Sequence, residues 1–324
     1  MGSRLYRCVP VLAMKEWSLG KVPHVYDLLI VGAGPAGITA AIYAARKKMD
    51  FIVLTPDIGG QVVWTSEIEN YTGFQYISGE ELTAKFRDHI ERFGFEVQME
   101  EVQKVEREGL LFLAKTSTQI FPCKTVIIAT GRTPKELGVP GEVQLKNRGV
   151  TYCATCDAPF FEDFEVAVVG GGNSGLEAVL QLAKIAKRIT LIEKSPQLKA
   201  DQVLVDAAKS SGKVDILTGA SVTRIIGEKS VTGIDVLQGG KESRIPVQGV
   251  FIEIGSKPNS DLVDSVEKNT WGEIIVNSRC ETSVPGLFAS GDVTNVPEKQ
   301  IIVAAGEGCK ASLSAFRYVS QMRI

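Results

Sequence analysis

The same order of apolar and small residues occurs twice along the chain, in Asp27–Thr55 and in Glu165–Glu193. Each copy begins with a short apolar run, Leu28–Val31 or Val166–Val169, that is typical of a buried strand. A glycine-rich turn, a helix rich in alanine and leucine, and a second apolar run follow in both copies. This pattern predicts two βαβ units, and therefore an α/β protein with a duplicated nucleotide-binding fold.

The glycine turns of the two copies carry the first candidate chemistry. In a βαβ unit the glycines permit a tight turn and let a pyrophosphate approach the backbone at the helix N-terminus. A single turn of this kind could lack a ligand, but two copies, each between a strand and a helix, favour two dinucleotide sites. The candidates are Gly32, Gly34, Pro35, Ala36 and Gly37 in the first copy, and Gly170, Gly172, Asn173, Ser174 and Gly175 in the second.

Two further apolar strands flank the second copy and indicate where the chain crosses between domains. Residues 125–131 and 249–255 both end in glycine, and proline follows within three residues. We expect an N-terminal extension at 1–25 and a first domain at 26–135 that resumes at 255–324. The second domain, at 136–254, would be inserted into the first and would carry the cysteine motif.

Length and charge narrow the possible functions. A chain of 324 residues suits two domains, and a net charge of −2 argues against nucleic-acid or anionic-membrane partners. The uncharged run 28–45 is long enough for a membrane helix, but three glycines and Pro35 interrupt it, and strand–turn–helix explains it. Because the first 26 residues show no signal-peptide cleavage site, we expect a cytoplasmic protein.

One cysteine pair has the spacing of a reactive dithiol. Of the six cysteines, only Cys153 and Cys156 form a Cys-x-x-Cys motif, just ahead of the second βαβ copy. A metal site would need more ligands nearby, and the chain has only two histidines, so no metal is expected. Beside a βαβ unit the motif indicates a redox-active pair, with a structural pair as the alternative. A position at a helix start would lower the pKa of one thiol.

In this order the motifs resemble the low-molecular-weight thioredoxin reductase family, from about residue 26 to residue 318. Besides the glycine turns and Cys153–Asp157, the shared segments are Gly59–Gln61, Ile68–Tyr71, Ala129–Gly131, Gly286–Asp292 and Lys299–Ile301. The resemblance implies an FAD-dependent oxidoreductase with two Rossmann-like three-layer domains, the second inserted into the first. It also implies a homodimer whose partner is thioredoxin or a thioredoxin-like protein.

The resemblance assigns roles to individual residues. FAD would lie on the discontinuous first domain. Its contacts would be Gly32–Gly37, Gly60, Gln61, Asn70, Thr130, Gly131, Gly291, Asp292, Lys299, Gln300 and Ile301. Cys156 would face the flavin, Cys153 would attack the partner disulfide, and Asp157 would move protons, since no histidine is near. By its residues alone, Asp292 would suit a turn equally well.

The chain differs from NADPH-dependent members of the family at the residues that would bind the electron donor. They typically carry an arginine pair after the second strand of the inserted domain, and this chain has Glu193 and Lys194 there. An acid at that strand end binds the 2′-hydroxyl of NAD and repels a 2′-phosphate, which favours NADH. NADPH remains an alternative through Lys194, although one ammonium is a poorer phosphate clamp than two guanidinium groups.

The same stretch resembles the NADH-using flavoprotein subunit of alkyl hydroperoxide reductase. Only 26 residues precede Asp27, so we expect no counterpart of that subunit's N-terminal thioredoxin-like domain and a separate dithiol protein as acceptor. Three enzyme alternatives remain: a ferredoxin-dependent reductase that does not use NAD(P)H, a reductase that feeds a peroxiredoxin system, and a dithiol oxidase that runs the chemistry backwards. A flavin-binding redox sensor is the non-enzymatic alternative, but a sensor would have no need of a second nucleotide unit.

Overall fold

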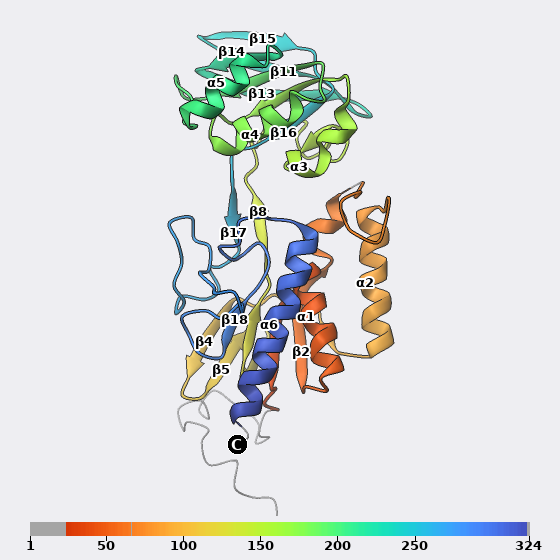
Figure 1. The fold of residues 1–324 in the computed structure, drawn as a ribbon, viewed down its shortest axis with the longest axis vertical. Coiled ribbons are helices and arrows are strands. Elements are labelled where there is room, and N and C mark those ends of the chain that lie inside the picture. The colour runs from red at the N-terminus through yellow and green to blue at the C-terminus, as the bar shows by residue number, and fades with distance from the viewer. Residues whose placement is uncertain (1–23, 66, 323–324) are drawn as a thin grey trace, which may run out of the picture. The chain divides into compact units, whose positions relative to one another are not determined.

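A computed structural model describes residues 24–65 and 67–322 of the chain. The expected extension at 1–25 lies outside the described residues up to position 23. The described residues form two compact units (Figure 1): residues 24–65, 71–133 and 257–322 in the first, and residues 67–70 and 134–256 in the second. The chain crosses at the paired strands β8 (Arg132–Pro134) and β17 (Ser256–Pro258). These crossings fall within two residues of the expected boundaries, whereas residues 67–70 carry no pattern that assigns them to the second unit.

A parallel sheet of five strands forms the centre of the described part of the first unit, in the order β18-β7-β1-β2-β3. Its strands are β1 (Leu28–Ala33), β2 (Phe51–Ile58), β3 (Val97–Gln98), β7 (Val126–Ile128) and β18 (Leu287–Ala289). The other elements are α1 (Pro35–Arg46), η3 (Gly60–Trp64), α2 (Gly79–Phe93), α6 (Ile301–Met322) and the antiparallel strands β4 (Lys104–Glu108), β5 (Leu111–Lys115) and β6 (Ile120–Cys123).

The alternation of side chains along β1 shows why this unit has three layers. Leu28 and Ile30 pack with apolar residues of α1 and α6 on one face of the sheet. Leu29 and Val31 pack with β4–β6 on the other face. Because both faces are covered, the strand reads as a continuous apolar run instead of an alternating one.

Helix α2 has a capping residue at each end. The Ser78 hydroxyl accepts a hydrogen bond from the Glu81 amide, and the Glu81 carboxylate accepts one from the Ser78 amide. This reciprocal capping satisfies amides that the first helical turn leaves unpaired. Gly94 ends the helix in the left-handed conformation, with φ of +62°.

The second unit repeats the plan, and its described strands form a parallel sheet of five in the order β12-β11-β10-β16-β9. These strands are β9 (Val150–Thr151), β10 (Glu165–Val169), β11 (Arg188–Glu193), β12 (Val214–Thr218) and β16 (Gly249–Ile252). The remaining elements are α3 (Ala154–Asp157), η4 (Ala158–Phe161), α4 (Asn173–Leu182), α5 (Gln202–Ser210) and the antiparallel strands β13 (Ala220–Gly227), β14 (Val231–Gln238) and β15 (Lys241–Ile245).

The core of the second unit follows the same alternation as that of the first. Val166 and Val168 of β10 pack with α4 and with Phe161, whose ring lies 4.9 Å from that of Phe251. Ala167 and Val169 pack with β13–β15 on the opposite face. The predicted α/β class, with two three-layer nucleotide-binding folds, is therefore confirmed. No helix within residues 24–65 and 67–322 is long and apolar enough to cross a membrane.

Candidate active site

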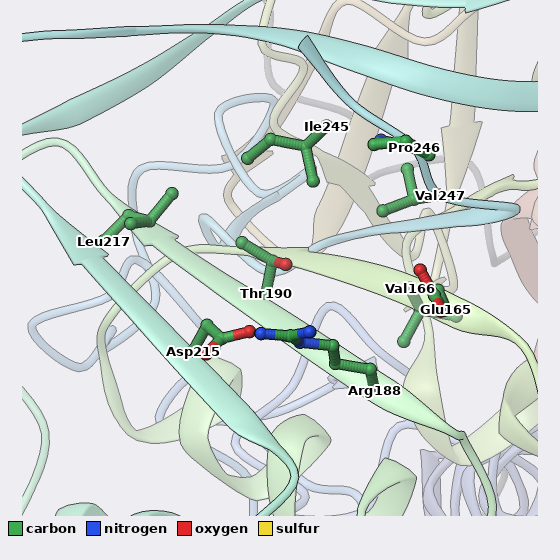
Figure 2. Close-up of a pocket in the computed structure, with 9 residues that line it drawn as sticks. All are labelled: Glu165, Val166, Arg188, Thr190, Asp215, Leu217, Ile245, Pro246 and Val247. Carbon is green, nitrogen blue, oxygen red and sulfur yellow. The ribbon is translucent and has the colours of Figure 1, made fainter. Parts of the chain in front are cut away.

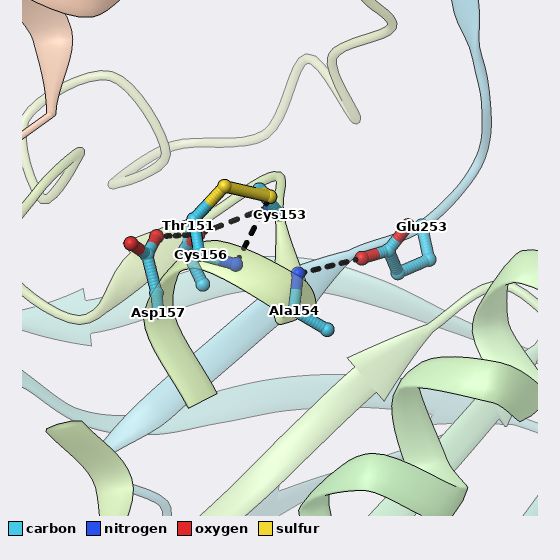
Figure 3. The surroundings of a disulfide bond; sticks show 6 residues. All are labelled: Thr151, Cys153, Ala154, Cys156, Asp157 and Glu253. Atoms are coloured by element: carbon cyan, nitrogen blue, oxygen red, sulfur yellow. Dashed lines mark hydrogen bonds between the residues drawn. A yellow bond between two sulfur atoms is a disulfide. The ribbon is translucent and has the colours of Figure 1, made fainter. Parts of the chain in front are cut away.

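The cysteine pair lies at the beginning of a short helix in the second unit. Strand β9 ends at Thr151, and α3 follows Cys153, its N-cap residue. Cys153 and Cys156 are joined by a disulfide, with their Cα atoms 5.3 Å apart (Figure 3). The Cys153 Sγ atom also accepts a hydrogen bond from the Cys156 amide at 3.2 Å. One helical turn thus brings the two sulfur atoms within bonding reach.

Asp157 ends this short helix, and Thr151 connects it to the cysteine pair. The Thr151 hydroxyl donates a hydrogen bond to the Asp157 carboxylate and accepts one from the Cys153 amide. Burial raises the pKa of Asp157, the Thr151 hydrogen bond acts against this rise, and the charge of Glu67 adds to it. A carboxyl with a raised pKa holds a proton more readily than a free carboxyl does, which makes Asp157 a candidate acid or base beside the cysteine pair.

Sequence reasoning missed Glu253, which follows β16 and contacts the cysteine helix. Its carboxylate accepts a hydrogen bond from the Ala154 amide at 3.2 Å (Figure 3). Burial raises the pKa of Glu253 to about 7, against the effect of the Ala154 hydrogen bond and with a contribution from Glu177. The signal in the sequence is an acid inside the apolar run 249–255, at the end of a strand where ligands of parallel sheets bind.

The second glycine turn has a geometry that only glycine allows at two positions. Gly170 has φ of +125°, and a Cβ atom on Gly175 would lie 1.9 Å from the Gly170 carbonyl oxygen. Gly172 is the N-cap of α4, and a Cβ atom there would meet nothing within 4 Å. No side chain of the described residues caps this helix. The first amides of α4 are therefore open to an anion, with Asn173 and Ser174 exposed beside them.

Glu193 sits at the end of β11 and turns its carboxylate back to the glycine turn. It accepts hydrogen bonds from the Gly171 amide and the Ser195 amide, each at 2.7 Å. Burial works to raise the pKa of Glu193, but these hydrogen bonds, together with Lys199, hold the pKa below its usual range. Glu193 is therefore an anion at neutral pH and places negative charge beside the nucleotide turn.

The first glycine turn has the same construction. Gly32 has φ of +104°, and a Cβ atom on Gly37 would lie 1.8 Å from the Gly32 carbonyl oxygen. Gly34 is the uncapped N-cap of α1, with Pro35 at the first helical position. Thr55 stands where Glu193 stands in the second copy, and its hydroxyl accepts a hydrogen bond from the Ala33 amide at 3.2 Å. The sequence duplication is thus a duplication of backbone geometry, with a neutral side chain at the strand end in one copy and an anion in the other.

Three other predicted FAD contacts are held by interactions within the first unit. The Gln61 amide donates a hydrogen bond to a β8 carbonyl at 2.5 Å, and the Thr130 hydroxyl donates one to a carbonyl at 2.6 Å. Lys299 forms an ion pair with Glu273 at 2.9 Å. Gly60 begins η3, and Gln300 directly precedes Ile301, the first residue of α6. Gly131 and Gly291 have positive φ. Asn70, which was expected in the first domain, groups with the second unit.

Asp292 has the environment that points most directly to a ligand. It lies in the loop between β18 and α6, where burial raises its pKa against the positive charges of Lys299 and Arg132. Its carboxylate accepts no hydrogen bond from the described residues. A part-buried carboxylate is costly unless a donor satisfies it, so Asp292 fits a ligand hydroxyl. The first turn and Asp292 follow carboxyl ends of one parallel sheet, which is where a dinucleotide such as FAD binds.

A pocket in the second unit lies at the opposite end of its sheet (Figure 2). It has a volume of about 400 Å³ and lies beside the first residues of β10, β11 and β12. Arg188 and Asp215, which both line the pocket, form an ion pair. The glycine turn follows the carboxyl end of β10, and the cysteine pair follows that of β9 in the same parallel sheet, so this pocket is separate from their chemistry.

Comparison with known proteins agrees with this arrangement. The pyridine nucleotide-disulphide oxidoreductase family model matches residues 26–308. Thioredoxin reductase from Streptococcus pyogenes superimposes with a TM-score of 0.88 at 39% identity, covering 92% of this chain and 99% of that one. One subunit of the alkyl hydroperoxide reductase of Escherichia coli is 42% identical over 303 residues, which are 91% of this chain and 58% of that protein.

A second curated relative, NADH dehydrogenase of Bacillus subtilis, is 42% identical over 298 residues, with 91% of this chain and 58% of that protein covered. The chain thus spans 58% of the length of both curated relatives. The likeness to the thioredoxin reductase structure extends over both units and confirms the resemblance found in the motifs. The chain therefore belongs to the pyridine nucleotide-disulphide oxidoreductase family, as an oxidoreductase of the thioredoxin reductase type.

Proposed function

We propose that this chain is a flavin-dependent disulfide reductase that takes electrons from NADH and delivers them to a thioredoxin-like protein. The observation that carries the proposal is the arrangement of β10, β16 and β9, which are parallel neighbours. The second glycine turn, Glu253 and the cysteine pair follow the carboxyl ends of these strands. A nucleotide turn and a disulfide on the same edge of one sheet match the two substrates of such a reductase.

The first unit would hold FAD through the residues whose geometry leaves room for it. The amides at the start of α1 would receive the pyrophosphate, with Gly32 and Gly37 closing the turn, and Asp292 would accept a hydrogen bond from a ribityl hydroxyl. Gln61, Thr130 and the start of α6 would line the remainder. Bound FAD would supply the two-electron carrier between the nicotinamide and the disulfide.

The cysteine pair performs the exchange with the partner. Two electrons and one proton convert the Cys153–Cys156 disulfide into one thiol and one thiolate. The Cys153 thiolate attacks the partner disulfide and forms a mixed disulfide, which Cys156 resolves as the partner leaves in its dithiol form. Asp157 would hold the proton that the departing sulfur takes up, since burial raises its pKa and lets it hold a proton more readily than a free carboxyl does.

The proposal requires the two units to change orientation during turnover. The nicotinamide turn and the cysteine pair both belong to the second unit, whereas the residues expected to hold FAD, Asn70 excepted, belong to the first. Hydride transfer and dithiol exchange each need the reacting atoms about 3–3.5 Å apart, so both cannot occupy one flavin position together. The connections β8 and β17 are the segments about which such a motion would occur.

The test of the proposed function is an anaerobic titration of the oxidised protein with NADH, NADPH and reduced ferredoxin in parallel, followed at the visible band of the flavin. NADH is expected to bleach the band at lower concentration than NADPH. Bleaching by ferredoxin alone would replace the proposal with the ferredoxin-dependent alternative. Turnover with a thioredoxin, and separately with a peroxiredoxin pair, then identifies the acceptor, and light scattering measures the expected homodimer.

The donor preference is expected to change when the charge at the end of β11 is reversed. Glu193→Ala with Lys194→Arg removes the carboxylate beside the Gly171 amide and adds a guanidinium that can pair with a 2′-phosphate. The ratio of kcat/KM for NADPH to that for NADH should rise about tenfold or more, which corresponds to about 1.4 kcal/mol. Lys194→Arg alone is the control, and an unchanged ratio in the double variant would exclude Glu193 as the specificity residue.

A further inference from the structure

Glu253 is a titratable group beside the cysteine pair that the proposed exchange does not use. Its amide donates a hydrogen bond to the Val169 carbonyl of β10 at 2.8 Å, which fixes the residue at the edge where the glycine turn begins. Its carboxylate accepts a hydrogen bond from the Ala154 amide, the peptide that directly follows Cys153. Glu253 therefore contacts the backbone of the redox helix itself.

The amides at the start of α3 are divided between a carboxylate and a sulfur atom. The Ala154 amide serves Glu253 at 3.2 Å, and the Cys156 amide serves the Cys153 Sγ atom, also at 3.2 Å. When the disulfide is reduced, a thiolate forms on the turn whose Ala154 amide already donates a hydrogen bond to the Glu253 carboxylate. Two like charges in a part-buried place raise each other's affinity for a proton.

We propose that Glu253 is a positioning residue whose own proton controls how readily the Cys153–Cys156 disulfide is reduced. The proposal rests on the redox role of the cysteine pair within the proposed function. With Glu253 ionised at the start, the disulfide and the carboxylate take up two electrons and two protons and give a thiol, a thiolate and a carboxylic acid. With glutamine at this position, the disulfide takes up two electrons and one proton and gives a thiol and a thiolate.

The neighbouring charges agree with this role. The field of Glu177, on α4, favours the protonated form of Glu253, whose pKa burial already raises to about 7. Asp157, at the other end of α3, is held by Thr151 of β9. From β10, the Val169 backbone carbonyl accepts a hydrogen bond from the Glu253 amide. The proton of Glu253 is thus exchanged near neutral pH, where a small change in the surroundings moves it on or off the carboxylate.

The experiment compares the full chain with Glu253→Gln and with Glu162→Gln, which removes an exposed carboxylate of the same unit. Each protein is equilibrated anaerobically with dithiothreitol redox buffers at pH 6, 7 and 8. Free thiols are then trapped by alkylation and counted by mass spectrometry. The reductant has its own pH dependence, but this cancels between variants at each pH.

At pH 6 Glu253 is mostly protonated, so the equilibrium constant for reduction should agree within about twofold between wild type and Glu253→Gln. At pH 8 the ionised carboxylate opposes the thiolate, so the constant of Glu253→Gln should be about three- to tenfold higher than that of wild type. Glu162→Gln should follow wild type at every pH. Neither a nicotinamide nor a protein acceptor takes part, so failure of the proposed function would leave this result intact.

Two outcomes would overturn the proposal. Equal constants for wild type and Glu253→Gln at pH 8 would show that the carboxylate does not act on the pair. An offset of the same size at pH 6 and pH 8 would show a structural effect of the substitution. Should Glu253→Gln fail to fold, the wild-type protein alone decides. After correction for the two protons that dithiothreitol releases on oxidation, reduction of the protein must take up about one proton below pH 7 and about two above it, and an unchanged uptake would overturn the proposal.

Discussion

Cys153→Ser and Cys156→Ser should each lower the rate of reduction of a protein disulfide by about 1,000-fold or more, while the protein still binds FAD. The reason is that the exchange needs both sulfur atoms: one to form the mixed disulfide and the other to resolve it. The disulfide belongs to the second unit, and the residues expected to contact FAD belong, with the exception of Asn70, to the first, so the substitution should leave the cofactor in place. Steady-state turnover with a thioredoxin and the flavin absorbance of the purified variants measure the two effects.

Cys309→Ser supplies the matched control. Cys309 is a free, half-buried cysteine of α6, remote in sequence from the motif. Its substitution tests whether any cysteine change lowers activity through oxidation or folding. Turnover should stay within about twofold of wild type. Full activity in either motif variant would contradict the assignment of the pair, and the structural interpretation of the Cys-x-x-Cys motif would then be the correct one.

Gly172→Ala and Gly175→Ala should separate ligand binding from folding in the second nucleotide turn. A Cβ atom on Gly175 would overlap the Gly170 carbonyl oxygen at 1.9 Å, so the backbone must move. Overpacking of this kind typically lowers the free energy of unfolding by about 1–3 kcal/mol, and occasionally by more. A Cβ atom on Gly172 meets no atom of the described chain within 4 Å, and its φ of −89° suits alanine. Only a bound pyrophosphate would encounter that methyl group.

The expected result for Gly172→Ala is therefore a free energy of unfolding within about 1 kcal/mol of wild type and NADH binding weakened about tenfold or more. Denaturant titration gives the first quantity, and the NADH concentration needed for half-maximal bleaching gives the second. Unchanged NADH affinity in Gly172→Ala would mean that this turn does not hold the donor. The FAD content should stay constant, because Gly172 belongs to the second unit.

The contrast between Gly172 and Gly175 shows what a motif can and cannot specify. Both are glycines of one fingerprint, whose order suggests their roles but gives no distance between backbone segments. In the structure the two glycines have different roles. Gly175 allows α4 to lie close to the backbone of Gly170, and Gly172 leaves space in front of the helix. The difference arises from the distance between two backbone segments, which no single residue encodes.

The sequence by itself determined the duplication, the two strand–turn–helix units, the cysteine motif and the family, because each depends on residues close together along the chain. Strand periodicity, turn glycines and thiol spacing are local properties, and local physics is what a sequence displays. Only the tertiary structure revealed that Glu193 turns its charge onto the Gly171 amide and that Asn70 groups with the second unit. Glu253 meets Ala154, 99 positions away in the chain, because β16 and β9 are parallel neighbours whose carboxyl ends share one edge. That proximity is a consequence of strand order, which the pairing of distant segments decides.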